Sequence, residues 1–341
     1  MDPLLANLSE AFGPSGFEEP VRSVLTEALA PHGDRAETDS MGNLLISKGL
    51  DRSGPRGLVA AHMDEVGFLI DDIDDQGFLR FKTLGGFDPR VLPSKRVVCG
   101  PNRVPGVVGA TPNHLLDKDD DRAPRIDDLY IDIGATSREE ATKLVGVGEA
   151  AAFDTAFAAL GELIKGKALD DRAGCYIAAR LAMSDVPLPM HYAFTVQEEV
   201  GLRGAKVAAN RVRPDFAVVL EATTCADRPD PTTAGHSTYM GRGPVLTFQD
   251  SSSVPNKALL DLLVETAKQE GIPFQWKETT LGGNDAGSIH KASGGIPTVS
   301  VSLPCRYIHS PCSFLYKSDI EHTVGLVEAF LTRISKEGVP T

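Results

Sequence analysis

The chain has 341 residues, a formal net charge of −13 at pH 7, 42% hydrophobic residues and 24% charged residues. This is the composition of a folded globular protein with room for one large domain or two, and it excludes a mostly disordered chain. The acidic excess, without any cluster of lysine and arginine, excludes nucleic acid and anionic membrane surfaces as partners.

The sequence predicts a cytoplasmic protein with free thiols. The first residues, MDPLLANLSE, lack the basic and apolar regions of a secretory leader, and no run of about 18 apolar residues is found. The five cysteines are odd in number and lack the spacing of zinc knuckles or redox pairs. Cys305 and Cys312 flank His309, but isolated cysteines are more often free thiols than metal ligands.

The first third of the chain predicts helices, then strands. Apolar residues recur at helical spacing from Leu4 to Phe12 and again from Val21 to Leu29. Short apolar runs at residues 43–46 and 57–61 predict buried strands, the second of which leads into His62. From about Gly67 to Asp154, short alternating segments punctuated by glycine, proline and acidic turns predict a small β-rich module. Its acidic stretch at residues 117–121 is expected to be a solvated loop.

After Asp170 the pattern changes to strands alternating with helices. The strand-like runs are HYAFTV, FAVVL, PVLTF, PFQWK and TVSVSL, and helices are expected near residues 203–210 and 256–270. Such alternation predicts a largely parallel sheet covered on both faces. Ser318 with Glu321 three residues later predicts a capping box at the start of the last helix.

Residue types that bind metals follow the predicted strands. In an open α/β sheet, ligands bind beyond the carboxyl ends of the strands. His62 follows the run GLVAA, and the adjacent Asp170 and Asp171 precede a predicted helix. The other candidates each follow a strand-like run: Glu198 and Glu199 after AFTVQ, Glu221 after AVVL, and His309 a turn after TVSVSLP.

The convergence of these residues favours two metal ions. Taken singly, each has a structural explanation, such as a helix N-cap or a solvated acid. Gathered at one edge, however, unpaired carboxylates would repel one another, and two divalent cations would remove that repulsion. The set offers one histidine and one acid for each ion and one bridging carboxylate, for which Asp170 is the candidate. Asp64, two residues after His62, either orients the imidazole or caps a turn.

The adjacent Glu198 and Glu199 suit two different roles. Neighbouring side chains diverge, so one of them can bind metal while the other takes a proton from the attacking water. Adjacency also argues against a glycosidase pair, whose carboxylates stand about 5 to 9.5 Å apart across the sugar bond.

Six motifs together resemble the M42 family of metallo-aminopeptidases, relatives of glutamyl and tetrahedral aminopeptidases. They are AHMDEVGF at His62, ALDDRAG at Asp170, VQEEVGLRGA at Glu198, LEATT at Glu221, GGNDAG at Asp285 and YIHSP at His309. The resemblance follows the order and spacing of these motifs over nearly the whole chain.

The resemblance implies a fold and a division into domains. We expect an α/β fold with a mixed, mostly parallel sheet flanked by helices, and a small β-barrel-like domain inserted into it. The catalytic domain would comprise residues 1–67 and 158–341, and the inserted domain, residues 68–157, would serve dimerisation. By resemblance we also expect a homo-oligomer, from a dimer to a tetrahedral dodecamer.

The resemblance also implies roles for the candidate residues. The metal ligands would be His62, Asp170 as the bridge, Glu199, Glu221 and His309, with Glu198 as general base and Asp64 in the catalytic set. Two divalent ions are expected per subunit, zinc or cobalt, with manganese also acceptable. Many family members have aspartate at the position of Glu221, and both acids bind such cations through the same carboxylate oxygens. Asp285 lies either near the site or in a glycine-flanked turn.

The expected function is therefore a metal-dependent aminopeptidase that removes N-terminal residues from short peptides. The sequence leaves three alternatives open. One is a related two-metal carboxypeptidase or deacylase, which acts on other amides. The others are a peptide- or metal-binding protein without catalysis, and a glycan hydrolase.

Overall fold

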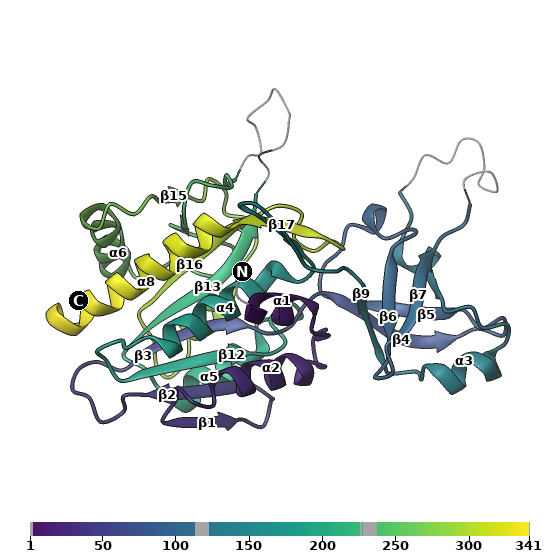
Figure 1. Ribbon diagram of the computed structural model, residues 1–341, viewed down its shortest axis with the longest axis horizontal. Coiled ribbons are helices and arrows are strands. Elements are labelled where there is room, and N and C mark those ends of the chain that lie inside the picture. The colour runs from purple at the N-terminus through teal and green to yellow at the C-terminus, as the bar shows by residue number, and fades with distance from the viewer. Residues whose placement is uncertain (1–2, 113–122, 226, 228–236, 341) are drawn as a thin grey trace.

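A computed structural model describes residues 3–112, 123–225, 227 and 237–340 (Figure 1). The acidic stretch at residues 117–121, expected to be a solvated loop, lies outside these residues. The described chain forms a large sheet with helices on both faces and a separate small barrel, which stands to the right in Figure 1.

The large sheet has eight strands, and its central strands are parallel. The order is β1-β2-β12-β3-β13-β16-β14-β15, with parallel pairing from β12 through β3 and β13 to β16. Antiparallel pairs join β1 to β2, β2 to β12, and β14 to β16. The expected mixed, mostly parallel sheet is confirmed. In sheet order the bounds are β1 (Arg35–Thr38), β2 (Leu44–Lys48), β12 (Met190–Thr195), β3 (Gly57–His62), β13 (Phe216–Thr224), β16 (Thr298–Cys305), β14 (Val245–Leu246) and β15 (Gln275–Trp276).

Two sets of helices bury the two faces of this sheet. The central strands are apolar on both sides, and every residue of β3 and β16 is buried, as expected for parallel strands between helical layers. Figure 1 shows α4 and α8 lying across the same face. The larger core cluster joins that face to α1 (Pro3–Glu10), α2 (Glu19–Leu29), α4 (Leu169–Met183), α6 (Lys257–Gln269) and α8 (Lys317–Glu337), and a smaller cluster joins the opposite face to α5 (Arg203–Val212) and α7 (Ala286–Ile289).

The predicted capping box of the last helix is wrong. The helix α8 begins at Lys317, its N-cap is Tyr316, and no side chain caps it. The reason is the strand β17 (Ser313–Tyr316), which leads directly into α8. Tyr316 pairs with Leu163 of β11 (Leu163–Gly166), the middle strand of a three-stranded sheet that also contains β10 (Ala158–Leu160). This pairing fixes the chain two residues before Ser318.

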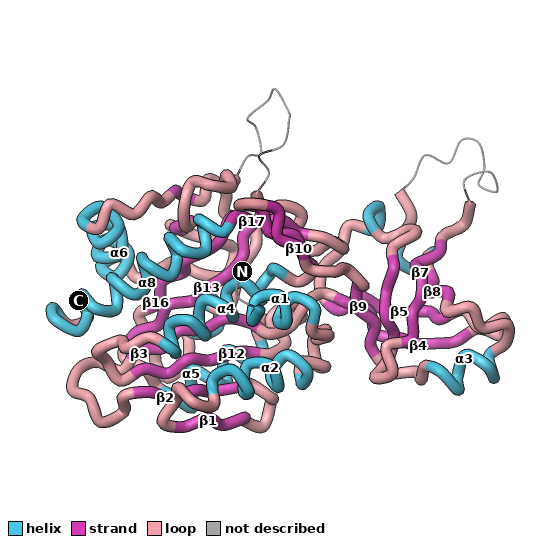
Figure 2. Tube along the Cα trace, viewed as in Figure 1, coloured by secondary structure: helices cyan, strands magenta, loops and turns pink. Residues whose placement is uncertain are grey.

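The described residues between Gly67 and Phe153 form a closed barrel with its own core. Its strand order is β4-β5-β8-β7-β6-β9, and Figure 2 shows these strands apart from the large sheet. Phe68 packs against Phe81 and Phe153 in the barrel core, with ring centroids 4.8 and 5.4 Å away. The expected barrel-like insertion is confirmed. Its elements are β4 (Gly67–Ile73), β5 (Leu79–Leu84), β6 (Arg96–Cys99), β7 (Val104–Gly109), β8 (Tyr130–Asp132), α3 (Arg138–Leu144) and β9 (Ala150–Phe153), with short 3-10 helices at Pro89–Val91 and Ile126–Asp128.

Among the described residues, no helix has the length and apolarity needed to cross a membrane.

Candidate metal centre

One cavity of about 660 Å³ at the carboxyl edge of the large sheet collects all six sequence-predicted ligand and base residues. They come from the end of β3, the start of α4, the loop after β12, the strand β13 and the loop between β16 and β17. The side chains that line the cavity include His62, Asp170, Glu198, Glu199, Glu221 and His309.

Glu221 reaches this cavity from within a strand, which corrects the expectation that its strand ends there. The strand β13 continues to Thr224 because its ladder with β16 runs on to Cys305. The ladder between β13 and β3, in contrast, ends at the pair Val219 and Ala60. His62 and Glu221 each follow that last pair by two residues, so their side chains lie together at the cavity.

Asp170 lies between two groups of possible ligands. Its Oδ1 is 3.3 Å from Nε2 of His62, which is itself 3.4 Å from Oε1 of Glu221. Its Oδ2 is 3.4 Å from Nε2 of His309, which is 3.1 Å from Oε1 of Glu199. The two oxygens of one carboxylate therefore face two separate pairs of an imidazole and an acid. This is the arrangement that a bridging ligand between two ions requires.

Asp171 is a further buried acid at this centre, which the sequence analysis named beside Asp170 without assigning it a role. Its Oδ1 accepts the backbone N–H of Gly174 at 3.0 Å. Ligand atoms of His62, Asp171 and Glu221 lie within 4.8 Å of one another, as do those of His62, Asp170 and Glu199. Its position beside Asp170 was the only signal in the sequence, and adjacent side chains usually point in different directions.

The donor set of the centre fits metal cations. Three buried carboxylate oxygens, Asp170 Oδ1, Asp171 Oδ2 and Glu221 Oε2, accept no hydrogen bond from any described residue. Burying such oxygens without partners is costly unless a cation compensates them. Imidazole and carboxylate are ligands that zinc and similar divalent ions accept. The residues therefore suit the two divalent ions that the sequence predicts.

The titration behaviour of these groups reflects their crowding. Burial raises the pKa of Glu199, and it raises the pKa of Glu221 well above its ordinary value, with the charge of Asp170 adding to both. Burial lowers the pKa of His309, but Asp170 and Glu199 outweigh it and raise that pKa to about 11. Burial also opposes protonation of His62, yet the surrounding carboxylates, Glu221 foremost, raise its pKa well above the ordinary value. Positive charge is therefore strongly stabilised at this centre.

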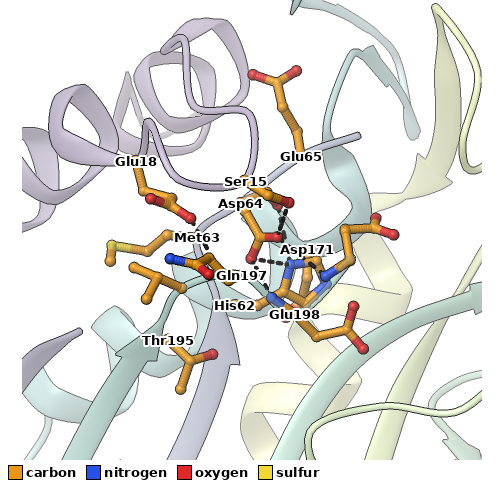
Figure 3. A network of polar contacts seen from close by, with 12 residues as sticks. Ser15, Glu18, His62, Met63, Asp64, Glu65, Asp171, Thr195, Gln197 and Glu198 are labelled. Atoms are coloured by element: carbon orange, nitrogen blue, oxygen red, sulfur yellow. Dashed lines mark hydrogen bonds and ion pairs between the residues drawn. The ribbon is translucent and has the colours of Figure 1, made fainter. Parts of the chain in front are cut away.

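Asp64 contacts both His62 and the backbone of the two glutamates (Figure 3). Nδ1 of His62 lies 3.0 Å from the backbone carbonyl oxygen of Asp64 and 3.5 Å from its Oδ1. That Oδ1 accepts the backbone N–H of Glu198 at 2.9 Å. Oδ2 of Asp64 accepts the N–H of Glu199 at 3.1 Å and the hydroxyl of Ser15 at 2.6 Å. Asp64 thus touches the imidazole and fixes the backbone that carries both glutamates. The sequence suggested only the first of these contacts.

The loop between α1 and α2 supports this arrangement, and nothing in the sequence pointed to it. Oε1 of Glu18 accepts the backbone N–H of Gly16 at 2.7 Å and that of Gln197 at 3.1 Å. Figure 3 shows Glu18 and Ser15 on the same side of Asp64 and Gln197. Burial, followed by the charge of Asp64, raises the pKa of Glu18 to about 6.

A buried ion cluster ties helix α1 to the strand end that carries His62. Nζ of Lys167 is 2.6 Å from Oε1 of Glu65, and burial lowers the pKa of Lys167 to about 8. The guanidinium of Arg172 donates to the carbonyl oxygens of Met63 at 2.7 Å and Ala11 at 3.0 Å. This cluster holds the chain on both sides of Asp64.

The remaining candidates lie outside the cavity lining. Asp285 is buried and its Oδ2 accepts the hydroxyl of Thr195 at 2.5 Å, while its neighbour Asn284 lines the cavity. Burial raises the pKa of Asp285 to about 6. All five cysteines are free, and neither Cys305 nor Cys312 lines the cavity. The preferred interpretation of the cysteines as free thiols agrees with the structure.

Comparison with known proteins gives a consistent family match. A family model described as M42 glutamyl aminopeptidase matches residues 42–326. The chain is 31% identical to a glutamyl aminopeptidase of Lactococcus lactis, over 97% of this chain and 96% of the relative. It is also 31% identical to a lysyl aminopeptidase of Pyrococcus furiosus, with the same coverage of 97% and 96%.

Solved structures match over the whole fold, barrel included. A TET aminopeptidase from a marine-sediment archaeon of the Thaumarchaeota superposes with a TM-score of 0.95 at 38% identity, covering 99% of this chain and 97% of that one. The TET1 peptidase of Pyrococcus horikoshii, which can assemble into a tetrahedron or a large octahedral shell, superposes with a TM-score of 0.86 at 34% identity, covering 96% and 98%.

Proposed function

Because the chain belongs to the M42 glutamyl aminopeptidase family, whose members are metal-dependent peptide hydrolases, we propose that it removes N-terminal residues from short peptides with two divalent metal ions. The observation that carries the two-ion proposal is Asp170, whose two oxygens face the pairs His62 with Glu221 and His309 with Glu199. Zinc or cobalt suits this donor set, and manganese is also acceptable.

The five ligands divide into two groups around Asp170. His62 and Glu221 would hold one ion, and Glu199 and His309 the other, with Asp170 shared between them. Bound ions of this kind polarise the scissile carbonyl and lower the pKa of water at the site. Asp64 would keep the imidazole of His62 in place through its backbone carbonyl oxygen, 3.0 Å from Nδ1, and its Oδ1, 3.5 Å away, while Nε2 faces the other ligands.

Glu198 is suited to move the proton. It lines the cavity, yet it takes part in none of the ion pairs found among the described residues, so its carboxylate is not committed to either histidine. Burial raises its pKa well above the ordinary value, which favours a carboxyl group that accepts a proton and releases it again. Glu198 would take the proton of the attacking water and deliver it to the leaving nitrogen.

The test compares free-amine and N-acetylated aminoacyl p-nitroanilides, using metal-stripped protein before and after addition of Zn²⁺, Co²⁺ or Mn²⁺. We expect metal-restored release from the free-amine substrates alone. Cleavage of the acetylated compounds would favour a deacylase, binding without release would favour a peptide-binding protein, and reducing sugar released from cellulose would favour a glycan hydrolase.

The proton-transfer role has its own test in Glu198→Gln. This variant should keep its metal and lose about a hundredfold or more in kcat. Glu139→Gln, on the barrel helix α3 where the side chain is 82% exposed, is the matched control and should be fully active. Near wild-type turnover in Glu198→Gln would assign the base to another group.

We also propose that the chain forms a homo-oligomer in the cytoplasm, with residues 68–157 as the dimerisation domain. The assembly of the similar TET1 peptidase and the free cysteines support these two statements. Sedimentation of the metal-loaded protein should give an assembly of two to twelve chains, and a stable monomer would contradict the proposal.

A further inference from the structure

A second cavity, of about 910 Å³, adjoins the metal centre on the side of the barrel. Its walls are the barrel loop at residues 86–95 and the loop at residues 307–312, and we call it the outer cavity. Ile308 and His309 line both cavities, so the two meet at a proposed metal ligand. The outer cavity has the size of a small-ligand site, and the proposed hydrolysis leaves it without a role.

Two glycines lie where the cavities meet. A Cβ at Gly86 would lie 3.9 Å from Nδ1 of His309, so the barrel loop passes beside this imidazole without a side chain pointing at it. Gly85 has a φ of +88°, and a Cβ there would lie 3.3 Å from Cβ of Glu199. The absence of side chains at both positions leaves room for a peptide to continue from the metal centre, past His309, into the outer cavity.

The outer cavity carries one uncompensated positive charge. Apart from His309, the charged residues on its described walls are Asp88, Arg90 and Lys95. Arg90 and Asp88 neutralise each other, because Nε of Arg90 lies 2.9 and 3.0 Å from the two carboxylate oxygens of Asp88. Lys95 takes part in no ion pair among the residues that the structure describes. This positive charge stands in a chain whose net charge is −13, and it suits an anionic group of the substrate.

The backbone fixes the position of Lys95 and leaves its ammonium free. Its N–H donates to the carbonyl of Leu92 at 3.1 Å, and its own carbonyl accepts the N–H of Val108 at 2.9 Å. The side chain starts from this fixed point directly before β6 and is exposed. Across the cavity, Tyr307 is 59% exposed and adds a hydroxyl. Ammonium protons and a phenolic hydroxyl are donors that a carboxylate accepts.

We propose that the outer cavity binds the C-terminal carboxylate of di- and tripeptide substrates through Lys95. The proposal rests on the proposed aminopeptidase function. A short peptide has an ammonium at one end and a carboxylate at the other; the acids of the metal centre suit the first, and Lys95 suits the second. Each residue of an extended chain spans about 3.3–3.6 Å, so the carboxylate of a di- or tripeptide lies roughly 3.5 to 7 Å beyond the scissile bond.

The experiment compares peptides that differ only after the scissile bond. All share one N-terminal residue, X, which is the residue that the wild type releases fastest in the p-nitroanilide panel. The substrates are X-Gly-Gly, its amide X-Gly-Gly-NH₂, and X-Glu-Gly-NH₂, which has an acidic side chain but no C-terminal carboxylate. Liquid chromatography of the released X gives kcat/KM for the metal-loaded, assembled protein.

We expect the wild type to cleave X-Gly-Gly with about fivefold higher kcat/KM than either amide. This is the factor of an ion pair in contact with solvent, since the side chain of Lys95 is exposed. Lys95→Met should remove the advantage and leave both amides unchanged, whereas Lys95→Arg should keep it. Lys143→Met is the control, because Lys143 is a barrel lysine on α3 with a side chain 70% exposed, outside the cavity lining.

Three results would overturn the proposal without touching the aminopeptidase function. One is a wild type that cleaves X-Gly-Gly and X-Gly-Gly-NH₂ equally well. Another is an equal loss toward all three substrates in Lys95→Met, which would make Lys95 a support of the loop. The third is cleavage of X-Glu-Gly-NH₂ as fast as X-Gly-Gly, which would assign the cavity to acidic side chains within the peptide. Silence toward every free-amine substrate with every metal would instead refute the proposed function.

Discussion

Replacing Asp64 by asparagine should weaken metal binding without touching a metal ligand. In the wild type the two carboxylate oxygens accept three hydrogen bonds, from the backbone N–H groups of Glu198 and Glu199 and from Ser15. Asparagine has one acceptor oxygen. Whichever way its amide is turned, the NH₂ group faces one of the two backbone N–H groups, and the buried donor stays unpaired.

The magnitude follows from that count. One unpaired buried N–H costs about 1–3 kcal/mol of stability. Loss of a group that orients a metal-binding histidine typically costs about tenfold to a hundredfold in metal affinity. Asp64→Asn removes the carboxylate charge beside His62 but keeps the backbone carbonyl 3.0 Å from Nδ1, so we expect a loss of about tenfold. Ser15→Ala keeps the carboxylate and removes one donor, so its effect on metal affinity should be smaller than that of Asp64→Asn.

The assay is isothermal titration of metal-stripped protein with Zn²⁺, together with urea unfolding of the same samples. Asp51→Asn, at an exposed turn, is the matched control and should change neither quantity. Wild-type metal affinity in Asp64→Asn would refute the reasoning. Reduced stability with unchanged affinity would show that Asp64 supports the fold alone.

Three further outcomes follow from the structure. The folded pKa of Glu18, about 6 against an ordinary 4.5, means that its contribution to stability is present below pH 4.5 and lost as the pH rises through 6. Glu18→Gln keeps an acceptor and does not titrate. In urea unfolding, the free energy of unfolding of this variant relative to wild type should therefore rise by about 2 kcal/mol between pH 4.5 and pH 7.5. An equal difference at both pH values would contradict this. Phe330→Ala, at a fully buried position of α8, should cost about 3–5 kcal/mol in the same assay, against under about 0.5 kcal/mol for the exposed Leu160→Ala; similar losses would be unexpected. Chelation should lower the thermal midpoint and added Zn²⁺ should restore it, whereas an unchanged midpoint would argue against ions that bind the folded state.

Hydrophobic periodicity and the residues at strand ends predicted most of the fold and of the ligand set. Apolar runs long enough to be buried on both faces predict parallel strands, and residues after such runs meet at one edge. That rule placed His62, Glu198 and Glu199 correctly in one cavity. It placed Glu221 there for an incomplete reason, because the β13 ladder continues past it.

The parts that the sequence did not predict depend on contacts between distant segments. Ser15 lies 49 residues from Asp64 along the chain, and Glu18 lies 179 residues from Gln197. No local pattern reports such pairs. The start of α8 was misjudged for the same reason, because β17 pairs with β11 and fixes the chain before Ser318.

The most direct test of the two-metal aminopeptidase is a titration of the stripped protein with Zn²⁺ or Co²⁺, in measured equivalents per chain, while release from a free-amine p-nitroanilide is followed. Activity should rise and level off at about two equivalents, as expected for two ions around Asp170. Full activity at one equivalent would contradict the two-ion centre, and no activity with any metal would contradict the enzyme itself.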